Sequence, residues 1–235
     1  MMKQVIKTIC QSVGISLVLS LSIAQAQVFE IKNGSKHYDA IIDMACEKNE
    51  CGDKAEVKLF KKGSKAIFQA FHSDELTMYL DENFKPSVNV IELYGEQSPL
   101  IFDDFNFDGT QDLAIRNGHY GPYGGPVYDI YVFNQSKQKF VLSQELSVLT
   151  QENLGMFQLD KKRKRIIALN KSGCCYHIRS EYQVVPKKGL LLVREFIEDE
   201  LTSNGNQVKV TDRHLINGKW KEKVKYYPSE KYYAQ

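Results

Sequence analysis

Beyond residue 26, apolar and polar residues mostly alternate with a period of two, the pattern of β-strands with one buried face. Turn signals rich in glycine and asparagine separate the alternating runs, and Asn217-Gly218 between two of them favours a type I′ hairpin. The predicted strands are Gln27–Lys32, His37–Asp43, Ala55–Phe60, Ala66–Phe71, Ser87–Leu93, Asp112–Arg116, Tyr128–Asn134, Phe140–Ser143, Arg165–Asn170, Tyr176–Val185, Leu190–Ile197, Gln207–Ile216 and Trp220–Tyr227.

This pattern predicts a single all-β domain over residues 27–235. Long helical patterns are absent from this part of the sequence, apart from a turn expected around Ser73–Tyr79. Many short strands at regular spacing favour a small β-propeller-like domain, with an antiparallel β-sandwich as the alternative. The sequence shows no strong internal repeat, so periodicity alone does not decide between them.

Residues 1–26 have the features of a secretory signal peptide. Lys3 and Lys7 precede the short apolar run Val13–Ile23, and Ala24-Gln25-Ala26 forms an A-x-A cleavage site. The apolar run is too short to span a membrane. We therefore predict cleavage after Ala26, no membrane span, and a protein exported to the bacterial periplasm.

The charge balance argues against binding to nucleic acid. The whole chain has 31 basic and 29 acidic residues, with a formal net charge of +2. Removal of the predicted signal peptide takes away two lysines and leaves a neutral protein, which attracts polyanions poorly. The basic run at 161–165 is expected to be a solvated hairpin turn.

Four cysteines remain after the predicted cleavage: Cys46, Cys51, Cys174 and Cys175. An even number in an oxidising compartment favours disulfides, with three possible pairings. One pairing joins Cys46 to Cys51 across a small loop and the adjacent Cys174 and Cys175 to each other. The other two connect these distant parts of the chain. A zinc site is a weaker option, because the spacings differ from the usual C-x2-C pairs.

The sharpest local motif is D-x-N-x-D-G-x-x-D at residues 104–112. Oxygen-bearing side chains alternate around a glycine that permits a tight turn, a pattern suited to the six to eight oxygen ligands of Ca²⁺. The motif resembles the calcium loop of FG-GAP blades in integrin-type propellers, and it predicts a structural calcium. The predicted ligands are the side chains of Asp104, Asn106, Asp108 and Asp112 and the backbone carbonyl of Thr110.

A second motif, S-G-C-C-Y, comprises Ser172, Gly173, Cys174, Cys175 and Tyr176. An S-G-x-x-Y loop of this kind resembles the loop with which periplasmic lysozyme inhibitors enter the lysozyme cleft. Together with the calcium-like motif, G-P-Y-G-G-P at 121–126 and Y-D-I-Y at 128–131, it resembles exported bacterial immunity proteins against secreted peptidoglycan hydrolases. That resemblance implies a calcium-bearing, FG-GAP-like β-propeller with an inhibitory loop.

The resemblance implies a periplasmic inhibitor or immunity protein that blocks a lysozyme-like peptidoglycan hydrolase. Ser172 and Tyr176 would donate hydrogen bonds to the carboxyl groups of the cleft, and Gly173 would allow close approach of the backbone. The loop containing His119, Tyr120 and Tyr123 is a further binding candidate.

Two alternatives remain open. In one, the protein is a calcium-binding, FG-GAP-like module for adhesion or glycan binding, without inhibition. In the other, it is an exported scaffold. In the first, the segment from Ser172 to Tyr176 is only structural. A core position for Tyr176, which shares a strand face with Ile178 and Ser180, is the alternative to an inhibitory role for this residue. No nucleophile or metalloprotease motif is present in the sequence, so we expect no enzymatic activity.

Overall fold

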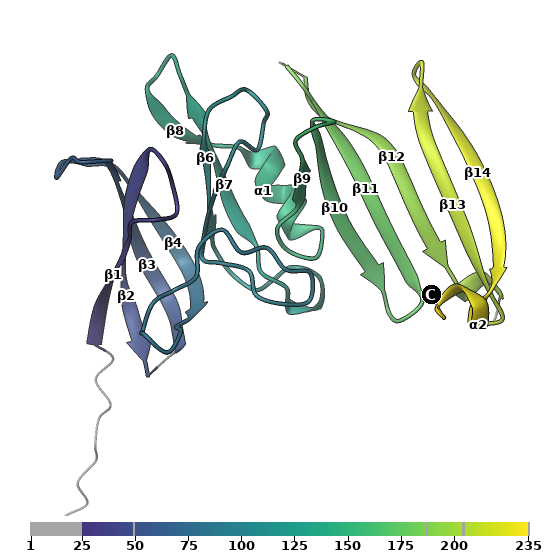
Figure 1. The fold of residues 1–235 in the computed structure, drawn as a ribbon, viewed down its shortest axis with the longest axis horizontal. Coiled ribbons are helices and arrows are strands. Elements are labelled where there is room, and N and C mark those ends of the chain that lie inside the picture. The colour runs from purple at the N-terminus through teal and green to yellow at the C-terminus, as the bar shows by residue number, and fades with distance from the viewer. Residues whose placement is uncertain (1–24, 49, 187, 204, 235) are drawn as a thin grey trace, which may run out of the picture.

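The computed structural model describes residues 25–234 apart from residues 49, 187 and 204, and Figure 1 shows three antiparallel sheets that follow one another along the chain. Residues 1–24, most of the predicted signal peptide, lie outside this description. Gln25 and Ala26 form the start of the first strand, so cleavage after Ala26 would leave a strand that begins at Gln27.

The first two sheets each contain four strands in meander order. Those of the first sheet are β1 (Gln25–Ile31), β2 (Tyr38–Glu47), β3 (Glu50–Lys61) and β4 (Ile67–Tyr79). Those of the second sheet are β5 (Leu100–Asp103), β6 (Asp112–Arg116), β7 (Tyr128–Asn134) and β8 (Lys139–Leu142).

The third sheet has six strands in the order β14-β13-β12-β11-β10-β9. They are β9 (Gln158–Asp160), β10 (Arg165–Ser172), β11 (Tyr176–Val185), β12 (Gly189–Asp199), β13 (Gln207–Ile216) and β14 (Lys219–Pro228). The helices in the described chain are α1 (Gln144–Gln151), α2 (Ser229–Tyr232) and the 3₁₀ turns η1 (Pro122–Gly124) and η2 (Leu201–Ser203).

This architecture confirms the predicted all-β class, and its packed antiparallel sheets are sandwich-like. Within the described part of the chain, none of the three sheets closes into a barrel. The finer prediction of a propeller-like arrangement stays a prediction.

The second sheet is the middle layer and is buried on both faces. Every residue of β6 is buried. Leu113 and Ile115 belong to the apolar core shared with the first sheet, while Ala114 belongs to the core shared with α1 and β10. The middle sheet therefore joins the two apolar cores of the molecule.

Helix α1 covers the part of β7 that β8 does not pair. The Ser147 hydroxyl oxygen accepts the Ile130 amide hydrogen at an N–O distance of 2.9 Å, and the Thr150 hydroxyl oxygen accepts that of Tyr128 at 2.9 Å. Two buried backbone donors thus find acceptors on a helix, where a further strand would otherwise be needed. The sequence did not predict this helix, because eight residues with few apolar positions show no clear helical period.

Two other local predictions are wrong. Residues 73–79 do not form a turn but continue β4, whose two-residue alternation is interrupted by a register shift at Asp74 and Glu75 and then resumes to Tyr79. Residues 87–93 do not form a strand. They lie in a long connection in which only the isolated bridges Leu80–Pro86 and Ile91–Gln97 occur.

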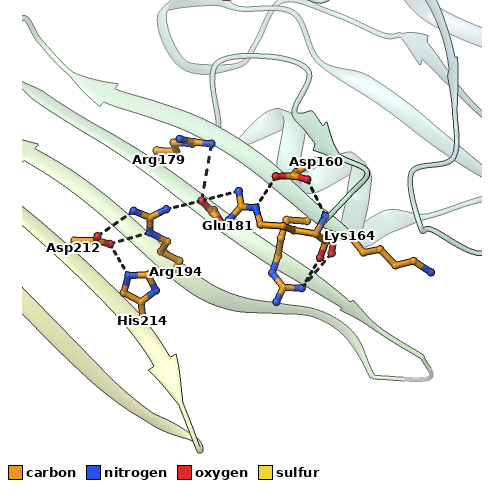
Figure 2. A network of polar contacts seen from close by, with 9 residues as sticks. Asp160, Lys164, Arg179, Glu181, Arg194, Asp212 and His214 are labelled. Carbon is orange, nitrogen blue, oxygen red and sulfur yellow. Dashed lines mark hydrogen bonds and ion pairs between the residues drawn. The ribbon is translucent and has the colours of Figure 1, made fainter.

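The basic run at 161–165 forms the turn between β9 and β10 and the first residue of β10, and Arg163 in this turn forms an ion pair with Glu181. Figure 2 shows the ion-pair network around Glu181 on the third sheet. Glu181, buried on β11, accepts hydrogen bonds from Arg163 at 2.8 Å and Arg194 at 3.1 Å. Arg194 also binds both oxygens of Asp212 on β13 and holds the pKa of that carboxyl below its ordinary value. The network ties the β9–β10 turn to strands β11, β12 and β13.

We expect Glu181→Gln to lower the free energy of unfolding by about 1.5–3 kcal/mol, because two arginines lose a buried, charged acceptor. The matched control is Glu222→Gln on the exposed edge strand β14, which should change it by less than about 0.5 kcal/mol. Urea unfolding of both variants measures the difference, and equal effects would contradict this role for Glu181.

Candidate functional site

The predicted calcium loop connects β5 to β6 and is closed by its own side chains. Asp104 accepts hydrogen bonds from the amides of Asp108 and Gly109 at 3.0 and 2.9 Å. The side-chain oxygen of Asn106 accepts a hydrogen bond from the backbone amide of Asp108, and the Asp108 carboxylate accepts one from the backbone amide of Thr110 at 2.8 Å. Gly109 has a φ of +88°, which explains why the motif needs glycine at this position.

Asp112 is the buried member of the set. Its two oxygens accept the amide hydrogens of Phe105 and Phe133, each at 2.9 Å, so one carboxyl group anchors the loop to β7. Burial raises the pKa of Asp112 to about 7, and the neighbouring charges of Asp108 and Asp104 contribute to the rise. The charges of Asp104 and Asp108 therefore disfavour a charged Asp112 in the same loop.

The donor chemistry of this loop fits a hard cation, since carboxylate, amide and backbone oxygens are the ligands that calcium takes. In the described residues, however, no group of three or more Asp, Glu, His or Cys side chains is arranged to hold a metal ion. The side-chain oxygens of Asp104, Asn106 and Asp108 point instead to amides of the same loop.

The S-G-C-C-Y motif is the turn of the β10–β11 hairpin. Ser172 and Tyr176 are directly opposite in the register, so their side chains lie on the same face at the end of the hairpin. Ser172 is exposed and Tyr176 is half-buried. Gly173 has a φ of +64°, the left-handed conformation that begins the three-residue turn.

Long-range contacts support this turn from outside the hairpin. The Gly173 amide donates a hydrogen bond to the Tyr123 hydroxyl, which comes from the connection between β6 and β7. The Lys171 ammonium lies over two aromatic rings, 4.5 Å from the centroid of Tyr94 and 4.8 Å from that of Tyr123. The Glu200 amide donates to the Cys175 carbonyl oxygen at 2.9 Å.

The structure thus brings two predicted features together. The aromatic loop containing Tyr123 lies against the S-G-C-C-Y turn, although 50 residues separate Tyr123 from Gly173 in the sequence. Tyr94 completes the group and was missed by sequence reasoning; its only signal was an aromatic residue beside Gly95 in a turn-like segment. Tyr94 and Tyr123 are each more than 60% exposed, so this end of the molecule presents aromatic surface.

The calcium-like loop and the aromatic loop that supports the S-G-C-C-Y turn lie at opposite ends of β6. The calcium-like loop precedes Asp112, and the aromatic loop follows Arg116. The predicted ligands and the predicted inhibitory residues therefore do not form one site.

Both disulfides are local. Cys46 and Cys51 pair across the β2–β3 hairpin, with an S–S distance of 2.03 Å, and both are buried. Cys174 and Cys175 are joined to each other within the S-G-C-C-Y turn, with their Cα atoms 3.7 Å apart. Of the three pairings that the sequence left open, the structure has this one.

The fold and the hairpin together define an all-β protein with a candidate binding loop at the end of its largest sheet. Neither the models of protein families nor the curated proteins contain a match to this chain. Among solved structures, the chain is similar to one described as the structure of a Xanthomonas type IV secretion system related protein. The similarity has a TM-score of 0.61 and 23% identity and covers 83% of this chain and 92% of the other.

No helix among the described residues is long and apolar enough to cross a membrane.

The disulfide pairing gives a direct prediction. We expect alkylation of the oxidised protein without reductant to find no free thiol on Cys46, Cys51, Cys174 or Cys175. Peptide mapping should then find one linked pair within residues 46–51 and a deficit of about two daltons on the peptide with Cys174 and Cys175, because each disulfide removes two hydrogens. A peptide that joins the two regions would contradict the structure.

Proposed function

We propose that this protein is an exported inhibitor that blocks a lysozyme-like peptidoglycan hydrolase by inserting the Ser172–Tyr176 turn into its active-site cleft. The observation that carries the proposal is the direct pairing of Ser172 and Tyr176 across the end of a supported hairpin. A rigid turn loses little conformational entropy on binding, so its contacts contribute more to affinity.

The chemistry of the turn suits a cleft with catalytic carboxyl groups. Glycoside hydrolases of this kind use two carboxyl groups that flank the bond to be cleaved. Two hydroxyl groups on one face of the hairpin can donate one hydrogen bond to each of them. Exposed Tyr94 and Tyr123 would then lie around the rim of the contact, and tyrosine is favoured in protein interfaces.

Two further observations support export as part of the proposal. Disulfides persist in oxidising compartments, and the described chain contains two. The similar solved structure is that of a protein related to a type IV secretion system, which is compatible with a role at the bacterial cell envelope for this chain. An inhibitor of this kind needs no catalytic activity of its own.

We also propose that the loop from Asp104 to Asp112 binds a structural calcium. The support is its oxygen-rich donor set and the repulsion that Asp104 and Asp108 exert on Asp112, which a divalent cation would relieve. This loop also favours the second candidate function, a calcium-binding, FG-GAP-like module for adhesion or glycan binding. An inhibition assay separates the two functions.

We expect Ser172→Ala and Tyr176→Phe each to weaken inhibition of a target hydrolase about ten- to a hundredfold, because each removes a hydrogen bond to a charged carboxyl group. The melting temperature should stay close to that of the wild type. The matched control is Tyr226→Phe on the exposed strand β14. A turbidity assay with peptidoglycan measures inhibition, and full inhibition by the Ser172→Ala, Tyr176→Phe double variant would rule out insertion of this turn.

We expect calcium to raise the melting temperature relative to chelator, because a ligand that binds only the folded state stabilises it. Asp108→Ala should abolish that rise, whereas the control Asp53→Ala, in an exposed segment of β3, should keep it. Differential scanning calorimetry with calcium and with chelator measures both. A wild-type protein that melts at the same temperature in both solutions would show that the loop binds no calcium.

A further inference from the structure

A pocket of about 510 Å³ lies between the end of β4, the connection from residue 81 to residue 99, and the end of β6. Its buried lining includes Met78, Leu80 and Pro99, which make an apolar floor, and Arg116. The pocket contains neither the Ser172–Tyr176 turn nor the predicted calcium ligands. It therefore belongs to neither proposed site.

Arg116 is an unusual residue for such a floor. It is only 7% exposed, yet no carboxylate among the described residues lies within 4.0 Å of its guanidinium. Its Nη1 donates to the Thr77 carbonyl oxygen at 3.1 Å, and its Nε is buried without any hydrogen-bond partner. The guanidinium carbon also lies 5.9 Å from the centroid of the Tyr128 ring, so its surroundings are a carbonyl oxygen and an aromatic residue, with no anion. A buried cation without an anionic partner is costly.

The acidic residues at the pocket do not fill this role. Asp81 and Glu96 are exposed and line the pocket together with exposed Lys85. The Asp81 carboxylate accepts the amides of Asn83 and Lys85 at 2.8 and 2.9 Å, so it closes its own turn. Neither acid forms an ion pair with Arg116 in the described structure.

We propose that this pocket binds a ligand with a carboxylate group and an apolar body. The carboxylate would lie on the Arg116 guanidinium, whose planar fork matches a carboxylate in geometry and charge. The apolar body would lie on Met78, Leu80 and Pro99. Such a group occurs in a small amphiphilic acid and at the free C-terminus of a peptide with an apolar last residue.

NMR titration of the wild-type protein tests directly whether the pocket binds such a ligand. Hexanoate should shift the Nε–H resonance of Arg116 and saturate, while hexanamide, which has the same body without the charge, should bind at least about tenfold more weakly. A short peptide that ends in a free leucine carboxylate, compared with its amidated form, tests the second source of the group. Whichever acid binds more tightly, hexanoate or the peptide with the free carboxylate, identifies the source of the carboxylate group.

Variants add a second readout. Arg116→Lys keeps the charge but loses the fork, so it should weaken binding of the acid about tenfold or more. Arg213→Lys, on an arginine that lies over the Trp220 ring in the third sheet, is the control and should bind as the wild type does. Where Arg116→Lys fails to fold, the wild-type titrations decide alone. The proposal is overturned if acid and amide bind equally, if neither acid binds, or if saturation leaves the Arg116 resonance unchanged.

Discussion

The two-sided burial of the middle sheet is the constraint on which the rest of the structure depends. Strand β6 has no exposed residue, and adjacent side chains on it enter two different apolar cores. Each of these cores in the described chain includes residues of the middle sheet. Because apolar surface is buried on both faces of β5–β8, the other two sheets pack on opposite sides of this sheet. This order brings the β6–β7 connection next to the β10–β11 turn.

This arrangement explains how a three-residue turn becomes a candidate binding element. The buried half of the β10–β11 hairpin packs in the second apolar core. The ion pairs of Glu181 hold the middle of the hairpin to the neighbouring parts of the third sheet (Figure 2). At its end, Tyr123 from the middle sheet's connection accepts a hydrogen bond from Gly173. The turn is therefore supported by its own sheet and by the neighbouring one, which reduces the freedom that binding would otherwise have to remove.

Polar groups in this protein are satisfied by contacts between distant parts of the chain. The hydroxyls of α1 accept amides of β7, and the Asp112 carboxylate joins the amides of Phe105 and Phe133. Arg116 differs from these groups, because one of its buried donors has no acceptor in the described structure. The other buried side-chain atom without a partner in the described residues is the Ser229 hydroxyl oxygen, and of the two residues only Arg116 lines the pocket of about 510 Å³.

The sequence by itself determined the all-β class, most of the strands and the residues of both motifs. Alternation with a period of two and Asn-Gly turns are local properties, so Asp112–Arg116, Tyr128–Asn134, Tyr176–Val185 and Gln207–Ile216 could be predicted to the residue. Only the tertiary structure decided which cysteines pair, that the aromatic loop of Tyr123 supports the S-G-C-C-Y turn, and that α1 replaces a strand beside β7. These features depend on contacts between residues far apart in the chain, and one sequence carries no local pattern that specifies such contacts.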